Sequence, residues 1–254
     1  MLNRARPPAT VDVWLAEPAD LTSSWLAHLD AVERSRAADL PGPQASRFIQ
    51  GRALLRAVLG EHLGCAPREV PLHVRCPTCA GPHGPVSLAT GTGTGPHLSL
   101  TRAGALVAVA VSEAGPVGVD VESHAAISAA PLGALPPSRR GVTARTRQRR
   151  AALTSAVARS WVSAEAVLKA TGAGLRTDPA DLVISSRRGR RTALTPDGTR
   201  AVLADLDLGP GVAGAVAVVP HAPGPTEPGG PSRLPRLSVH QHDGDAVLAA
   251  LGTR

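Results

Sequence analysis

Hydrophobic residues follow two different spacings along the first half of the chain. Apolar positions three and four residues apart predict amphipathic helices at 21–38 and 45–63. Pro41 and Pro43 bound the first helix, and Gly64 ends the second. Short runs rich in valine, alanine and leucine predict strands at 11–15, 97–100, 105–111 and 117–122.

The second half shows a similar mixture of elements. A helix is predicted from about Ser155 to Thr171, where Gly172 and Gly174 end it. Strands are predicted at 181–185, 200–206 and 213–219. The last of these resembles 105–111, which is a weak sign of internal duplication because Ala/Val alternation is common in so alanine-rich a chain.

This order of elements predicts an α/β (α+β) protein. We expect an N-terminal α/β half over 1–114 and a C-terminal α/β half over 115–222. Proline and glycine are frequent from Pro220 to Pro235, so 223–254 is predicted to be a linker and a tail that is disordered or loosely packed.

Composition limits the function classes. The chain has 254 residues, enough for one large domain or two small ones. It contains three Trp, one Phe and no Tyr, so its core must consist of Ala, Val and Leu, and little is left to stack on exposed bases. The start lacks the apolar core of a signal peptide, and no apolar run approaches the roughly 20 residues that span a bilayer. We therefore expect a cytoplasmic protein with reduced cysteines and no membrane contact.

The net charge of +7 arises in one region. Between Glu122 and Glu165 there is no acidic residue, while seven arginines stand between Arg139 and Arg159. Such a segment binds nucleic acid or an acidic protein, or is simply a solvated face. The scarcity of aromatic residues makes nucleic acid the less favoured partner. The only lysine in the chain is Lys169.

The sequence V117-G-V-D-V-E122 contains the first candidate chemistry. Because side chains alternate along a strand, Asp120 and Glu122 share one face, Gly118 leaves room for a ligand on it, and the valines face the core. Two carboxylates beside open space suit Mg²⁺, which takes one or two carboxylates together with substrate phosphate oxygens. The alternative is an amphipathic edge strand with two solvated acids.

The predicted helix at 155–171 contains the second candidate. Glu165 and Lys169 are four residues apart and therefore neighbours on one helix face. They are either a third metal ligand and a phosphate-binding cation, or an exposed ion pair beside a core Trp161.

A third cluster combines His73, Cys76, Cys79 and His83. These are four possible zinc ligands, although a single Cys-x2-Cys beside histidines is also typical of a tight turn with reduced thiols.

Together these motifs resemble the 4'-phosphopantetheinyl transferases of the Sfp type. That family has a V-G-[VI]-D-[VI]-E strand followed by a W-x-x-K-E-A-x-x-K helix that ends in G-x-G-L. Residues 117–122 match the strand fully, and the helix matches at Trp161, Glu165, Ala166, Lys169, Gly172, Gly174 and Leu175. The stretches 47–56, 76–84 and 97–104 resemble the family's early arginine helix, its nucleotide-proximal loop and its Ser-His strand turn.

The resemblance implies a pseudo-twofold pair of similar α/β subdomains with the active site at their interface. It implies Mg²⁺-dependent transfer of 4'-phosphopantetheine from coenzyme A to a serine of an apo acyl or peptidyl carrier protein, releasing adenosine 3',5'-bisphosphate. Asp120, Glu122 and Glu165 would hold the metal. Asp120, Glu165 and Lys169 would be catalytic, with Glu165 accepting the serine proton and Lys169 serving the leaving phosphate. Coenzyme A would be bound by Arg47, Arg52, His83, Arg102 and Lys169.

Three positions depart from the family pattern. The family usually has lysine at Ala164, histidine at Arg102, and lysine or arginine at Pro85. The alternative function is therefore a catalytically impaired member that binds coenzyme A or the carrier without transfer. The resemblance further implies a monomer, with acidic carrier domains as partners of the arginine segment.

Overall fold

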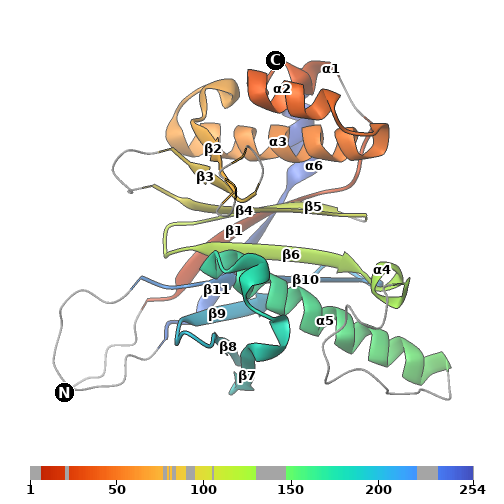
Figure 1. Ribbon diagram of the computed structural model, residues 1–254, viewed down its shortest axis with the longest axis vertical. Helices are drawn as coiled ribbons and strands as arrows, with labels where there is room; N and C mark the ends of the chain where they lie inside the picture. The colour runs from red at the N-terminus through yellow and green to blue at the C-terminus, as the bar shows by residue number, and fades with distance from the viewer. Residues whose placement is uncertain are drawn as a thin grey trace.

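The computed structural model describes residues 7–20, 23–76, 79, 81, 84–89, 95–104, 106–129, 147–221 and 234–253. Within these residues the helices and the two main sheets are stacked as helix, sheet, sheet, helix (Figure 1). The predicted mixed α/β class is confirmed.

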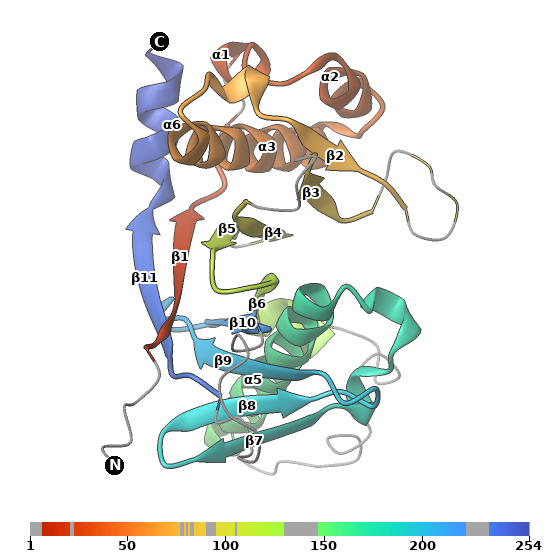
Figure 2. The ribbon, with the colours of Figure 1, turned by 90° about the vertical axis from the view of Figure 1, so that its left-hand side faces the viewer.

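The first sheet brings together segments from both ends of the chain. Its strands are β1 (Ala9–Ala16), β4 (His97–Ala103), β5 (Leu106–Ser112) and β11 (Leu237–Asp243). They are arranged in the order β11-β1-β5-β4, and β11 runs parallel to β1, as Figure 2 shows. Its outer face is covered by α1 (Ser23–Leu26), α2 (Ala31–Ala38), α3 (Gly42–Leu63) and α6 (Gly244–Gly252).

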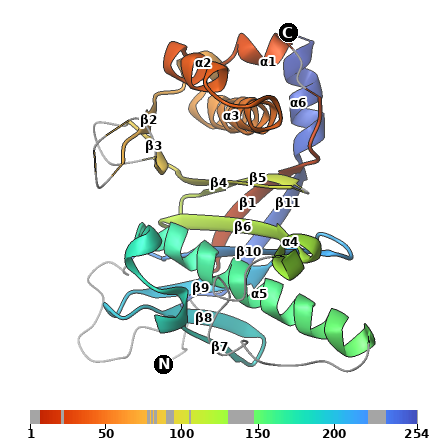
Figure 3. The same ribbon diagram turned by 45° about the vertical axis from the view of Figure 1, so that its right-hand side comes forward.

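The second sheet is antiparallel throughout and has the order β6-β10-β9-β8-β7. Its strands are β6 (Val117–Ser123), β7 (Val183–Arg187), β8 (Arg190–Leu194), β9 (Arg200–Asp205) and β10 (Val212–Val218). One long helix, α5 (Arg147–Thr171), lies along β6 and β10, as Figure 3 shows, and the short α4 (His124–Ala129) follows β6.

Short elements complete the chain. A two-stranded hairpin, β2 (Leu72–Val74) and β3 (Val86–Leu88), lies beside β4. Single 3-10 turns occur at Pro67–Glu69, Gly174–Arg176 and Pro179–Asp181. In the part of the chain that the structure describes, no helix has the length and hydropathy needed to cross a membrane.

Three apolar layers hold the stack together, and valine and alanine dominate the central one. Val11 and Val13 of β1 meet Val119 of β6 and Val216 of β10 between the two sheets, and all four are completely buried. A second layer joins the first sheet to its helices, and a third joins the second sheet to α5. Small β-branched residues suit the central layer because two sheets packed face to face are only about 10 Å apart.

Most predicted elements are confirmed, and the differences have local causes. The stretch 21–38 contains two helices rather than one, because the Asp30 side chain accepts a hydrogen bond from the Glu33 N–H and starts a new helix there. Leu21 lies outside the described residues. Helix α5 begins at Arg147, earlier than predicted. The sequence pattern does not predict the short elements β2, β3, α4 and β8.

The predicted disordered or loosely packed tail is wrong from Leu237 onward. Seven residues of β11 pair with β1, and α6 buries Leu248 and Leu251 against the helices of the first layer. The Trp25 Nε1–H donates to the Leu248 carbonyl at 3.3 Å. This part of the chain is therefore an edge strand and a core helix of the first half.

Candidate functional site

Helix α5 lies directly on strand β6 at Gly118. A Cβ atom at this glycine would lie 2.0 Å from the Ala166 carbonyl oxygen and 2.5 Å from the Ala170 nitrogen. No side chain fits such a gap. The expectation that Gly118 leaves room for a ligand is therefore wrong, because the helix backbone fills that room. The consequence is that Glu165 and Lys169 are brought next to the carboxylates of β6.

Asp120 is held from two sides. Its Oδ1 accepts hydrogen bonds from Lys169 Nζ at 2.7 Å and from Thr101 Oγ1 at 3.0 Å. Lys169 Nζ also donates to the Val119 carbonyl at 2.9 Å. Asp120 is only 7% exposed, so the interpretation of residues 117–122 as a strand with solvated acids does not hold for this residue.

Glu122 and Glu165 lie in the electrostatic field of Asp120. Burial and then the charge of Asp120 raise the pKa of Glu165 above its ordinary value, against the opposing effect of Lys169. Burial and Asp120 likewise raise the pKa of Glu122. Among the described residues, Lys169 is the cation that acts on all three carboxylates, so negative charge accumulates at this point.

The carboxylates do not form a ready-made metal cage. Among the described residues, no group of three or more His, Cys, Asp or Glu side chains is placed so that it could hold a metal ion. Asp120, Glu122 and Glu165 are among these residues, and their side chains are not gathered around a common point. His83 lies outside the described residues. The zinc hypothesis and the predicted contact of His83 with coenzyme A therefore both stay predictions.

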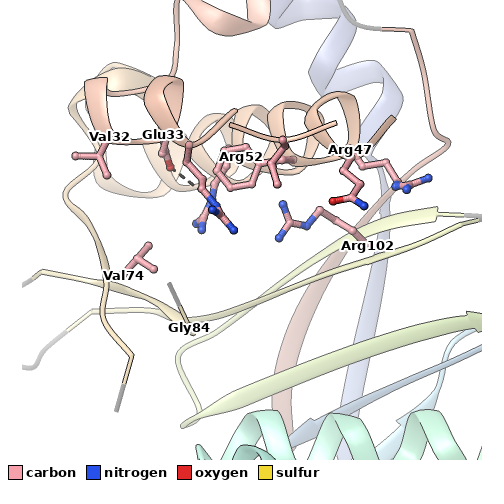
Figure 4. A pocket seen from close by; sticks show the side chains of 11 residues that line it. Val32, Glu33, Arg47, Arg52, Val74, Gly84 and Arg102 are labelled. Carbon is pink, nitrogen blue, oxygen red and sulfur yellow. Dashed lines mark ion pairs between the residues drawn. The ribbon is translucent and has the colours of Figure 1, made fainter. Parts of the chain in front are cut away.

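Four arginines line a cavity on the other side of the first sheet, and one of them, Arg36, is not singled out by the sequence. The cavity, of about 340 Å³, lies between α2, α3, β2 and β4, and Arg47, Arg52 and Arg102 also line it. In Figure 4, Arg52 from the helix and Arg102 from the strand point toward each other. Val32, Leu40, Phe48 and Val74 line the same cavity, so it combines an apolar wall with cations.

Arg52 has buried donors without hydrogen bonds. The residue is 5% exposed, and its Nε and Nη1 atoms make no hydrogen bond to any described group, although Nε lies 3.6 Å from Glu33 Oε1. Glu33 Oε1 also lacks a hydrogen bond, so it and Nε form a loose ion pair. Nη1 is then the buried donor that remains for a ligand with acceptor oxygens, since buried polar groups are nearly always paired.

Arg102 lies in a cation-rich surrounding. Arg102 is exposed at the edge of the cavity, yet the protein atoms packed around its side chain, then Arg52 and then Arg47, lower its pKa to about 10, so it keeps its charge at neutral pH. The Phe48 ring centroid lies 5.2 Å from its Cζ and 5.4 Å from the Cζ of Arg52, so one ring contacts both cations. Charge-assisted hydrogen bonds from such guanidinium groups are suited to an anion such as phosphate.

Arg56 shows that helical spacing alone does not identify the ligand-binding arginines. It lies four residues after Arg52 on α3, yet its guanidinium is fully buried in structural contacts. It pairs with Asp30 and Glu33 and donates to the carbonyls of residues 67, 68 and 70.

Strand β4 separates the two clusters. Thr101 faces Asp120, whereas the next residue, Arg102, faces α3, as alternation along a strand requires. The sequence did not single out Thr101. The sequence feature that could have identified Thr101 is its position next to Arg102 on β4, the strand that packs against β6 and its carboxylates.

A second cavity, of about 440 Å³, begins at Lys169 and lies between β3, β4 and the end of α5. His97 and Ser87 line it. Burial, and to a lesser degree His221, lowers the pKa of His97, so His97 is neutral near pH 7. The structure also places the three residues that depart from the family pattern. Ala164 is buried on α5, and Pro85 is exposed. Arg102 supplies a cation to the cavity of about 340 Å³.

Searches of protein-family models and of curated proteins found no match to this chain.

Proposed function

We propose that this protein transfers 4'-phosphopantetheine from coenzyme A to a serine of an apo acyl or peptidyl carrier protein, with Mg²⁺ as cofactor. The observation that carries the proposal is the packing of Gly118 against α5, because it puts Asp120, Glu122, Glu165 and Lys169 of two separate motifs into one charged cluster. The resemblance to the Sfp-type transferases rests on those same two motifs. Releasing adenosine 3',5'-bisphosphate requires cations for several phosphates, and the two clusters on either side of β4 supply them.

Asp120, Glu122 and Glu165 are the residues proposed to hold Mg²⁺. The chemistry of the donors suits Mg²⁺, which prefers carboxylate oxygens, although the three side chains are not gathered around one point as they stand. Burial and the charge of Asp120 raise the pKa values of both glutamates, and a divalent cation would offset that charge. Bound there, the ion would neutralise charge that develops on the pyrophosphate of coenzyme A.

Glu165 is the proposed proton acceptor. The serine oxygen of the carrier attacks the phosphorus that bears the pantetheine arm, and the bond from that phosphorus to the oxygen of the adenosine bisphosphate breaks. The serine proton passes to the carboxylate of Glu165, which lies in the same charged cluster as Asp120 and Lys169.

Lys169 is the proposed partner of the leaving phosphate. Two of its three N–H donors bind Asp120 and Val119, which leaves one for a phosphate oxygen. Arg47, Arg52 and Arg102 would hold the remaining phosphate of the nucleotide, with apolar side chains of the 340 Å³ cavity beside them.

The finer fold assignment is part of the same proposal. Each sheet has one long helix on its outer face, α3 on the first and α5 on the second. We propose that the two halves are related by a pseudo-twofold axis and that coenzyme A binds between them. A monomer in the cytoplasm, acting on acidic carrier domains, follows from the same resemblance.

The test is intact-mass measurement of apo carrier domains after incubation with the protein, coenzyme A and Mg²⁺. We expect a phosphopantetheine adduct on the carrier, and we expect EDTA to prevent its formation. Glu165→Gln and Lys169→Met should each lower the rate of adduct formation at least a hundredfold. Glu61→Gln, which neutralises an exposed glutamate on α3, is the matched control and keeps full activity.

The alternative is a member that binds coenzyme A without transferring the arm. Buried Ala164 favours it, because this position supplies no cation to the phosphates. Coenzyme A binding in calorimetry without any adduct on a broad carrier panel would support this alternative, and absence of both would reject the resemblance.

A further inference from the structure

Thr101 reaches from the first sheet to the carboxylates of the second. Its Oγ1 donates to Asp120 Oδ1 at 3.0 Å, on the same oxygen that accepts from Lys169 at 2.7 Å. Thr101 is 8% exposed and Asp120 is 7% exposed, so water does not compete effectively for this hydrogen bond. The carboxylate is thus bound by one residue from each half of the protein.

A second hydroxyl of the same strand strengthens the connection. Ser99 lies on the same face of β4 as Thr101, and its Oγ accepts a hydrogen bond from the Val119 N–H at 3.1 Å. Strands β4 and β6 are edge strands of different sheets, so no backbone ladder joins them. The two hydroxyls therefore join β4 to two consecutive residues of β6.

Two donors on one oxygen fix the rotation of a carboxyl group. Because Oδ1 of Asp120 is bound to both Lys169 and Thr101, the carboxyl group cannot rotate freely, and its other oxygen, Oδ2, stays in one orientation. Without Thr101, the carboxylate would be held only by the flexible lysine side chain. That lysine is 31% exposed on its side chain and is itself a candidate for contact with substrate.

We propose that Thr101 is a positioning residue that orients Asp120 for divalent-cation binding. This inference rests on the proposed function, in which Asp120 is a metal ligand. Outer partners of metal-binding carboxylates typically change metal affinity by 10- to 100-fold when removed. A purely structural hydroxyl would change stability and leave metal affinity as it was.

The experiment measures Mn²⁺ binding to the full-length protein by electron paramagnetic resonance, with no coenzyme A present. Thr101→Val keeps the shape of the side chain and removes the hydroxyl, and we expect it to weaken Mn²⁺ binding at least tenfold. Thr101→Ser keeps the hydroxyl and should remain within about threefold of the wild type.

Ser112 provides the matched control. It is 3% exposed on β5, and its hydroxyl donates to the Thr10 carbonyl at 2.8 Å, away from the carboxylates. Ser112→Ala should lower the unfolding midpoint while Mn²⁺ affinity stays at the wild-type value. If Thr101→Val does not fold, Thr101→Ala against Thr101→Ser gives the same comparison, since this pair differs only by the hydroxyl.

The outcomes separate this inference from the proposed function. Tenfold weaker Mn²⁺ binding in Thr101→Val, rescued in Thr101→Ser, supports the positioning role even if no carrier is modified. Equal binding in wild type and Thr101→Val overturns it, even if transfer occurs. A wild-type protein that binds no Mn²⁺ overturns it together with the metal assignment.

Discussion

Gly118 is the residue at which the two motifs of the site come together. Replacing it with alanine would put a Cβ atom 2.0 Å from the Ala166 carbonyl oxygen, so α5 and β6 must move apart. We expect Gly118→Ala to lower the free energy of unfolding by about 3 kcal/mol, the upper range for overpacking, and to abolish transfer. Urea unfolding followed by circular dichroism measures this. Gly42→Ala, where a Cβ atom meets nothing within 4 Å, is the control and should not destabilise.

Glu165 should make the metal-free protein less stable at neutral pH. Its pKa is raised in the folded state, so the stability present at low pH is lost as pH rises from its ordinary value of 4.5 through the raised pKa. Glu165→Gln removes this loss. In EDTA we expect the variant to melt at a higher temperature than the wild type at pH 7 and at the same temperature at pH 4. A lower melting temperature at pH 7 would mean that ionised Glu165 is stabilised in the folded state.

The sequence predicts some of these residues and not others, for physical reasons. Asp120 and Glu122 are predictable because period two places both on one strand face, and Glu165 and Lys169 because residues four apart share a helix face. Thr101 is not, because its role depends on β4 lying against β6, strands of different sheets. The room expected at Gly118 was misjudged because the sequence does not tell whether a ligand or a helix fills it.

Strand β11 and helix α6 are a part of the fold that the sequence pattern does not predict. Only the first residues of Leu237–Asp243 are partly buried, so the segment lacks the pattern of a core strand. Seven residue pairs in the ladder with β1 hold this strand in place. Such pairing depends on the tertiary fold and not on the local sequence pattern. Helix α6 does show apolar residues three apart, at Leu248 and Leu251, but the Pro/Gly-rich stretch before it suggested a tail.

Truncation of a single leucine tests the importance of α6. Leu251 is 4% exposed and packs against the helices of the first layer, so we expect Leu251→Ala to cost about 2 to 4 kcal/mol. Chemical denaturation measures this cost. Ala249→Ser, on the exposed face of the same helix, should change stability by less than about 0.5 kcal/mol. A cost for Leu251→Ala as small as that of the control would indicate that α6 is detached in solution.

The two sheets of the protein share one core. Buried residues of β1 and β5 pack against those of β6 and β10, so neither half can unfold without exposing the other. We therefore expect one cooperative unfolding transition. Trp25 lies in the first half and Trp161 in the second, which makes fluorescence a reporter for each.

Variants that keep only Trp25 or only Trp161, with the other tryptophans replaced by phenylalanine, should unfold at the same urea concentration. A Trp161 transition at lower urea than the Trp25 transition would show that the second half unfolds first and that the shared core is weaker than its burial indicates.

The parallel pairing of β1 with β11 also has a consequence during synthesis. The partner of β1 on that side begins at Leu237, more than two hundred residues after β1 ends at Ala16. At about 5 to 20 residues per second, a ribosome needs roughly 10 to 45 s to make the intervening chain. Throughout that interval one edge of β1 exposes unpaired backbone groups to other nascent chains. Slower translation of the intervening segment should therefore increase aggregation of the newly made protein.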